Sequence, residues 1–254
     1  VTGTVESIPL IASSIMSKKI AEGADALVLD VKTGSGAFMK DPEASRELAR
    51  TMVGLGEAAG VRTVALVTAM DRPLGRAAGN AVEVAESVEV LAGGGPADVV
   101  ELTLALAREM LAGAGREDVD PADALADGRA MDVWRRMIAA QGGDPDAPLP
   151  RPVETHVVTA PATGRLTRLD AFSVGVAAWR LGAGRARKED PVSAAAGVVW
   201  TAGLGDHVTA GQPLLELQTD DAARIPRALE ALECAVGIDT ADEPLPLILE
   251  RITG

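Results

Sequence analysis

Aromatic side chains are scarce in this sequence. Phe and Trp together make up 2% of its 254 residues, and Tyr is absent. Proteins that bind single-stranded nucleic acid stack successive bases on aromatic rings, so few such platforms can be built here. The formal net charge is −13, from 24 basic and 37 acidic residues, and an acidic surface repels a polyanion. We therefore expect no nucleic-acid partner and no acidic membrane surface as a partner.

Cysteine and histidine are also rare. Cys234 is the only cysteine, and His156 and His207 are the only histidines. An internal disulfide and a cysteine-based zinc site are excluded, and a multi-histidine metal site is not expected. No apolar run approaches the ~20 residues of a membrane-spanning helix, and the first residues do not look like a secretory signal. We expect a cytoplasmic protein with no membrane partner. Because Val1 is not Met, we expect the chain to begin inside a longer reading frame.

Apolar residues make up 47% of the chain, enough for one large domain or two modest ones. Residues 26–31 and 63–68 are short, nearly continuous apolar runs, typical of strands buried on both faces of a parallel sheet. Residues 41–60 have helical periodicity, so the order strand, helix, strand predicts a βαβ unit. Further helices are expected over residues 7 to about 22, with Ser7 as N-cap, and over residues 81–91, 97–111 and 122–140.

A proline-rich segment follows these helices. Residues 142–152 contain four prolines and two glycines, which predicts an extended linker. Beyond it, the sequence predicts short strands and a turn that resembles small β-sandwiches of the biotinyl or lipoyl kind. Those carrier domains present a modifiable lysine on a hairpin tip, whereas Lys188, the only lysine in this region, has no apolar hairpin around it. We therefore expect a structural domain, with strands over residues 155–158, 164–169 and 197–200 and a turn and strand over residues 205–217.

The first expected helix carries a pair of polar residues one turn apart. Ser14 and Lys18 are four residues apart and so lie on one face of the helix. A hydroxyl beside an ammonium suits a planar heterocycle, because the hydroxyl can bond a ring N–H and the ammonium can donate to a ring carbonyl. If the heterocycle is a leaving group, the lysine stabilises the negative charge that develops on it. On spacing alone, a solvated face of an amphipathic helix is the commoner explanation.

Two further clusters follow the two expected strands. Gly34-Ser35-Gly36 comes after the first, at the end of a parallel strand where ligands bind, although a tight turn explains the same residues. After the second strand, Asn80 is a good N-cap and Glu83 completes a variant of the capping box. Glu86, near the next turn, could reach back towards carbonyls of the preceding loop and bind a cation with them. A solvated carboxylate explains Glu86 more simply.

In their order, spacing and residue identities, these clusters resemble the thymidine and pyrimidine-nucleoside phosphorylases. The similarity is most specific in three stretches and extends in outline through the rest of the chain. It implies a small helical domain and a large α/β domain that close on each other, in a homodimer. The stretches are residues 1–19, which resemble the family's base-binding helix and its approach, residues 30–38 and residues 79–84.

The resemblance implies a pentosyltransferase that cleaves thymidine, uridine or deoxyuridine with inorganic phosphate, giving a free base and a pentose 1-phosphate. Ser14 and Lys18 match the serine and lysine that hold the pyrimidine. The carbonyls of Leu74 and Ala77 and the carboxylate of Glu86 match part of a potassium site described in some members. Inorganic phosphate is the co-substrate, the partner is a small pyrimidine nucleoside, and no organic cofactor is implied.

The fold class expected from pattern and resemblance together is α/β with a mostly parallel sheet, flanking helices and a barrel-sandwich-like α+β domain. The expected domains are a remnant of the helical domain over residues 1–22, the α/β domain over 23–143, the linker over 144–152 and the C-terminal α+β domain over 153–254.

The chain departs from the family at its beginning. The family's phosphate-binding residues, its catalytic histidine and its signature motif precede the point where this chain begins, and its base-binding arginine falls just ahead of Val1. No catalytic residue is therefore assigned here, and we expect the chain alone to be inactive. Two alternatives stay open: a non-catalytic binding or assembly module on the same fold, and a related phosphoribosyltransferase, which the Ser14 and Lys18 helix disfavours.

Overall fold

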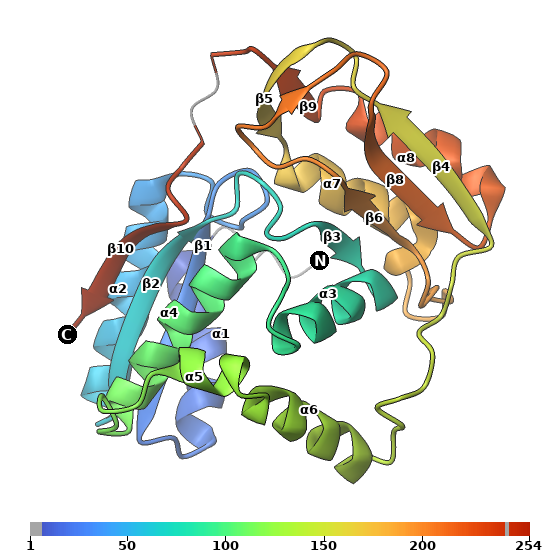
Figure 1. The fold of residues 1–254 in the computed structure, drawn as a ribbon. Coiled ribbons are helices and arrows are strands. Elements are labelled where there is room, and N and C mark those ends of the chain that lie inside the picture. Colours follow the sequence, from blue (N-terminus) through green and yellow to red (C-terminus); the bar gives the residue numbers. More distant parts are fainter. Residues whose placement is uncertain (1–6, 242–243) are drawn as a thin grey trace. The chain divides into compact units, whose positions relative to one another are not determined.

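The computed structural model describes residues 7–241 and 244–254. Residues 1–6, the first part of the expected base-binding segment, lie outside this range. The described chain is a mixed α/β structure with several small sheets (Figure 1). Contacts divide the chain into two compact units, each built from separate stretches of sequence. The first comprises Val1–Asp71, Val100–Ala122 and Leu245–Gly254, and the second comprises Arg72–Val99 and Asp123–Pro244.

The first unit is built on the expected βαβ element. The strands β1 (Ala26–Thr33) and β2 (Arg62–Ala69) pair in parallel over their whole length, and α2 (Pro42–Ala58) connects them. Asp41 caps α2 by accepting a hydrogen bond from the Glu43 amide at 2.7 Å. β2 is almost entirely buried, whereas β1 is only half-buried, so full burial was expected correctly for one strand and not for the other.

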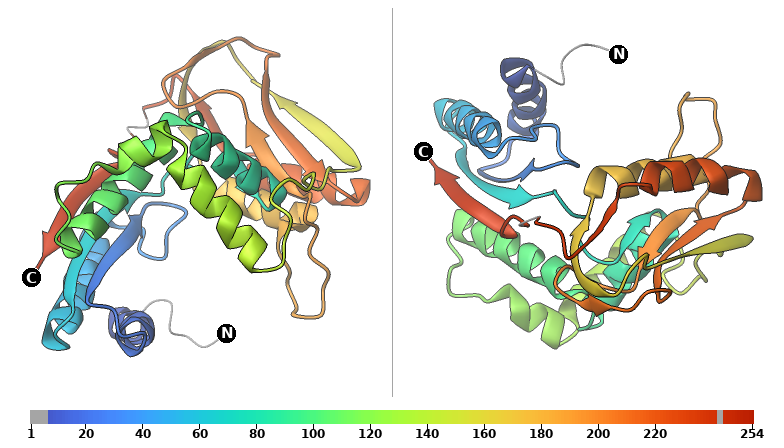
Figure 2. Two further views of the ribbon diagram at one scale, coloured as in Figure 1. Left: turned by 60° about the horizontal axis from the view of Figure 1, so that its bottom comes forward. Right: turned by 90° about the horizontal axis from the view of Figure 1, so that it is seen from above.

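A third strand, β10 (Ile248–Thr253), completes this sheet by pairing antiparallel with β2, giving the order β1-β2-β10. The described sheet therefore holds one parallel and one antiparallel pair, where a mostly parallel sheet was expected. Two helices, α1 (Ile8–Ala21) and α2, cover one face, and α4 (Ala97–Gly113) lies on the other (Figure 2). The core between α1, α2 and the sheet is aliphatic, with Met16, Ala49, Val67 and Ile252 among its buried members.

The second unit contains two small antiparallel sheets. One has the order β3-β6-β8-β4 and the other has the order β7-β5-β9. Their bounds are β3 (Ala77–Gly79), β4 (Glu154–Thr159), β5 (Gly164–Leu169), β6 (Gly197–Trp200), β7 (His207–Val208), β8 (Pro213–Thr219) and β9 (Val236–Ile238). The sheets share a core with α7 (Ala171–Ala178) and α8 (Ile225–Leu232), which includes fully buried Leu166, Leu181 and Leu217. The short strands expected after the linker are therefore present.

One helix differs from the expectation, and another agrees with it. The single helix predicted over residues 122–140 is broken into α5 (Pro121–Ala126) and α6 (Arg129–Ala140). Gly128 has a φ of +83°, a left-handed conformation that a continuous helix does not allow, and the Asp127 carboxylate accepts the Arg129 amide at 3.1 Å. The helix α3 (Ala81–Leu91) has its predicted bounds.

The division by contacts differs from the domain order expected from the sequence. Residues 141–153 carry no helix or strand, as expected of a linker, but they lie within the second unit. The last strand, β10, belongs to the first unit. Among the described residues, no helix is both long enough and apolar enough to cross a bilayer.

Candidate functional site

The expected base-binding helix is present as α1. Ser7 is its N-cap residue but makes no side-chain capping bond, and Pro9 lies in the first turn, where its missing N–H costs nothing. Ile11, Ala12 and Met16 are buried against α2 and the sheet. This inner face positions the helix rigidly and leaves the other face exposed.

Ser14 and Lys18 both lie on the exposed part of α1. Neither side chain forms a hydrogen bond or ion pair with another described residue, whereas the neighbouring Lys19 pairs with Glu22 at 3.2 Å. The structure therefore holds a hydroxyl and an ammonium one turn apart on a fixed helix, with all their hydrogen-bonding capacity available. Such a pair can bind one polar edge of a planar ring.

The glycine-rich loop after β1 is held tightly to the loop after β2. Gly34 has a φ of +118°, and a Cβ atom added there would collide with the backbone of Met70 and Asp71. The Met70 amide donates to the Thr33 carbonyl at 2.6 Å, and the Gly36 amide donates to the Met70 carbonyl at 2.8 Å. The carboxyl ends of the two parallel strands thus form one rigid edge, which is where open α/β sheets bind ligands.

A polar network lies near the same end of β1 and β2, and sequence reasoning missed it. Lys32 Nζ lies 2.7 Å from Asp30 Oδ2, and the Thr68 hydroxyl donates to Asp30 Oδ1. Both members of the ion pair are about one-quarter exposed. Asp30 and Lys32 are alternate residues of one strand, so their spacing was the signal that could have revealed the pair.

The loop before β3 carries the residues expected to bind a cation. Glu86 Oε1 accepts a hydrogen bond from the Arg76 amide at 2.7 Å, and a Cβ atom at Gly75 would collide with the same carboxylate. Asp98, which the sequence did not single out, accepts the Gly75 amide at 3.1 Å. Glu86 does reach back to this loop, but its observed bond is to an N–H, whereas carbonyl groups were the expected neighbours.

Burial raises the pKa of the Glu86 carboxyl above its ordinary value. The hydrogen bond from the Arg76 amide and the Arg76 charge partly offset this rise in pKa, while the charges of Asp98 and Glu83 add to it. A half-buried carboxylate with two acidic neighbours is therefore destabilised in its charged form. A bound cation would reverse that effect.

The start of α3 is organised differently from the expected capping box. Asn80 occupies the N-cap position, but its side chain donates instead to the Ala183 and Ser193 carbonyls, at 2.9 Å each. Glu83 Oε1 accepts the Gly79 amide at 2.7 Å, one residue before the N-cap. The residue types were identified correctly, and their partners were not.

The two sets of expected ligand residues lie in different compact units. Ser14 and Lys18 belong to the first unit, and Leu74, Ala77 and Glu86 belong to the second. His156 and His207 lie on exposed positions of β4 and β7 in the second unit, and Cys234 is free and exposed. Within residues 7–241 and 244–254, no group of three or more His, Cys, Asp or Glu side chains could hold a metal ion.

Two protein families match the sequence. Residues 1–131 match the family described as "Glycosyl transferase family, a/b domain", and residues 165–239 match the "Pyrimidine nucleoside phosphorylase C-terminal domain". The first match covers more than half of the chain. These matches coincide with the α/β region and with the region of short strands.

Curated relatives are similar over nearly the whole chain. Identity is 58% over 255 residues to the thymidine phosphorylase of Mycobacterium tuberculosis (strain CDC 1551 / Oshkosh), covering 99% of this chain and 59% of that protein. Identity is 47% over 228 residues to the pyrimidine-nucleoside phosphorylase of Bacillus subtilis (strain 168), covering 85% of this chain and 53% of that protein. It is 42% over 264 residues to the pyrimidine-nucleoside phosphorylase of Staphylococcus epidermidis (strain ATCC 12228 / FDA PCI 1200), covering 100% and 61%. The chain spans less than two thirds of the length of these relatives.

Proposed function

Because the chain belongs to the thymidine and pyrimidine-nucleoside phosphorylase family, we propose that it forms part of an enzyme that cleaves pyrimidine nucleosides. The substrate is thymidine, uridine or deoxyuridine, inorganic phosphate is the co-substrate, and the products are the free base and a pentose 1-phosphate. Phosphate replaces the base at the sugar carbon, so the reaction involves no change of oxidation state and requires no organic cofactor.

The contribution of this chain is to bind the base. The observation that carries this proposal is the exposed, unpaired Ser14 and Lys18 on the rigidly packed α1. The Ser14 hydroxyl bonds the ring edge and orients it, and the Lys18 ammonium donates to a ring carbonyl. As the bond between base and sugar breaks, negative charge spreads onto that carbonyl. The lysine then binds the leaving base more strongly than the substrate, which lowers the barrier.

Replacement of Lys18 tests this role. We expect Lys18→Ala to weaken thymine and thymidine binding to the purified chain by about tenfold or more, the usual effect of losing a hydrogen bond from a charged group. Isothermal titration calorimetry measures the affinity. Lys19→Ala is the matched control, because Lys19 is the next residue on the same helix and already pairs with Glu22. Equal affinities of wild type and Lys18→Ala would remove the basis of the proposal.

We also propose that the loop before β3 binds potassium, through the carbonyls of Leu74 and Ala77 and the carboxylate of Glu86. Hard oxygen ligands suit such a cation. The half-buried Glu86, whose charged form is destabilised by burial and by Asp98, supports a cation at this position. Its Oε2 atom faces Gly75, and its other oxygen is already occupied by the Arg76 amide.

Thermal unfolding in matched salts tests the potassium proposal. We expect KCl to raise the melting temperature of the wild type relative to tetramethylammonium chloride at the same ionic strength, and Glu86→Gln to abolish the difference. The raised pKa means that the folded state loses stability as pH rises and Glu86 ionises, so the effect of K⁺ should be larger at about pH 7 than at about pH 4. Glu47→Gln, which removes an exposed carboxylate of α2 in the other unit, should keep the K⁺ effect. A K⁺ effect that survives in Glu86→Gln would place the cation elsewhere.

A further inference from the structure

A cavity of about 420 Å³ lies in the second unit, and its lining is basic although the chain as a whole is acidic. One side of it is formed by the turn η1 (Trp179–Ala183), which extends α7, and by the loop that follows η1. The other side is formed by the 3₁₀ turn η2 (Ala222–Arg224) and the start of α8. Four arginines and two aspartates line it. A positive site within a protein of net charge −13 attracts an anion locally and calls for an explanation.

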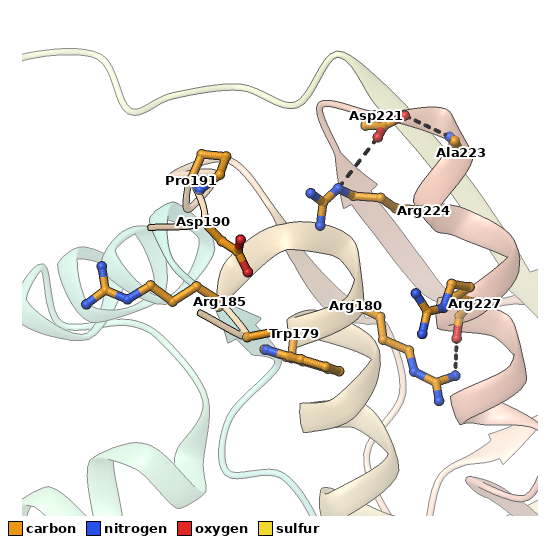
Figure 3. A pocket seen from close by; sticks show the side chains of 11 residues that line it. Trp179, Arg180, Arg185, Asp190, Pro191, Asp221, Ala223, Arg224 and Arg227 are labelled. Atoms are coloured by element: carbon orange, nitrogen blue, oxygen red, sulfur yellow. Dashed lines mark hydrogen bonds and ion pairs between the residues drawn. The ribbon is translucent and has the colours of Figure 1, made fainter. Parts of the chain in front are cut away.

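Several of these arginine side chains keep free donors. Arg224 Nε lies 3.6 Å from Asp221 Oδ2, too long for a good hydrogen bond. The Arg227 side chain makes no hydrogen bond or ion pair with any other described residue. Arg180 donates to the Arg227 carbonyl and lies 3.3 Å from Glu230, but its buried Nε has no acceptor in the described part of the chain. Arg185 points away from these three arginines (Figure 3).

The two aspartates offset only part of the positive charge of the four arginines, and one oxygen of each aspartate is bonded within its own loop. Asp190 Oδ2 accepts the Arg187 amide at 2.9 Å, and Asp221 Oδ1 accepts the Ala223 amide at 3.0 Å. Both bonds are local and hold the walls of the cavity in shape. The cavity therefore presents donors with few internal acceptors, which is the character of an anion site.

An exposed tryptophan lies beside the arginines. Trp179 is 42% exposed in a chain with only three tryptophans. A Cβ atom at Gly184 would lie 2.7 Å from Trp179 Cδ1, so the backbone of this glycine packs against the indole and fixes it. Gly182, with a φ of +113°, turns the chain beneath Arg224. This turn, whose backbone is non-helical at Gly182, places an aromatic ring and a guanidinium around one opening (Figure 3).

We propose that this cavity binds a small organic phosphate that carries a planar ring, as a nucleotide does. Arg224, Arg227 and Arg180 bind the phosphate, because guanidinium groups match phosphate oxygens in geometry and charge. Trp179 stacks on the ring. The cavity has the volume of a small-molecule site, and an inorganic anion alone would leave the exposed indole without a role.

Calorimetric titration with adenosine 5′-monophosphate at low salt tests the proposal. A purine nucleotide is chosen because the proposed reaction uses pyrimidine nucleosides. A failure of the nucleotide to bind therefore says nothing against the proposed reaction, and a failure of the proposed reaction says nothing against nucleotide binding. We expect saturable binding that weakens by about tenfold or more in Arg227→Ala and weakens further as salt is added. Arg136→Ala is the matched control, because Arg136 is another exposed helical arginine of the second unit and does not line the cavity.

Two fragments of adenosine 5′-monophosphate test the contributions of its phosphate and of its ring to binding separately. Ribose 5-phosphate should bind more weakly than the nucleotide, and adenosine more weakly still. Trp179→Phe, which retains an aromatic ring, should bind the nucleotide better than Trp179→Ala, and circular dichroism establishes that each variant is folded. Absence of saturable binding, equal affinity of Arg227→Ala and wild type, or equal affinity for nucleotide and ribose 5-phosphate would each overturn the proposal.

Discussion

At the scale of single residues, backbone geometry determines where the candidate site can form. Gly34 is the clearest case, because only a residue without Cβ allows the loop after β1 to approach Met70 and Asp71. That approach joins the ends of two parallel strands into one edge. The first glycine of the Gly-Ser-Gly pattern, which was ambiguous in sequence, is therefore required for the close approach of the two loops.

We expect Gly34→Ala to destabilise the fold by about 1–3 kcal/mol or more, because the new methyl group meets backbone atoms and the residue has a positive φ. The free energy of unfolding from urea titration measures the change. Gly54→Ala is the control, since Gly54 lies within α2 and has nothing within 4 Å of its added Cβ. It should stabilise the protein by about 0.5–1 kcal/mol, as alanine favours helix. A loss of stability no larger in Gly34→Ala than in Gly54→Ala would contradict this account.

At the scale of elements, the last strand of the chain completes the first sheet. β10 pairs with β2, Arg251 makes a two-pronged contact with Glu109 of α4 at 2.6 and 2.9 Å, and Glu250 lies 2.6 Å from Arg46 of α2. These contacts link β10 to helices assigned to both faces of the sheet. β10 is therefore integral to the first unit, although the whole of the second unit separates it from β2 in the sequence.

Ile252→Ala tests the importance of β10. Ile252 is buried against the core of the first unit, so truncation should cost about 2–5 kcal/mol through lost burial and the cavity left behind. Thr253→Ala, at the neighbouring exposed position, should change the free energy of unfolding by no more than about 0.5 kcal/mol. Chemical denaturation followed by circular dichroism provides the comparison. Similar effects of the two substitutions would show that β10 contributes little to the folded unit.

At the scale of the whole molecule, the open edge of the first sheet is the main feature. In the sheet order β1-β2-β10, β1 is an edge strand. Among the described residues it pairs along its length with β2, and on other segments only Thr33 forms a bridge, to Met39. It is also less buried than its apolar sequence predicts. An unpaired, half-buried edge strand favours pairing with another chain. We therefore expect a homodimer or a related assembly to cover surfaces of this unit.

Sedimentation equilibrium over a range of protein concentrations tests this expectation. The apparent mass should rise above the 26.0 kDa of one chain as concentration increases. The same series at high salt separates apolar and backbone contributions to association from electrostatic ones. Apolar and backbone pairing should persist when surface charges are screened. A single mass of one chain at every concentration would contradict the expectation.

Much of the local structure was determined by the sequence alone. The apolar runs at residues 26–31 and 63–68 and the periodic segment between them predicted the βαβ unit, and α3, β5 and β6 have their predicted bounds. The spacing of Ser14 and Lys18 placed both residues on one exposed part of α1. These features follow from neighbours within a few residues, which side-chain periodicity and capping encode directly.

Only the tertiary structure decided which distant residues meet. It showed that β10 joins β2, that Glu86 bonds an amide beside Asp98, and that arginines about 45 residues apart in the chain line one cavity. It also divided the predicted helix at Gly128, whose left-handed backbone no periodicity reveals. Such contacts depend on loop paths and on packing between elements. A single sequence specifies these jointly over the whole chain, so no local pattern identifies the partners.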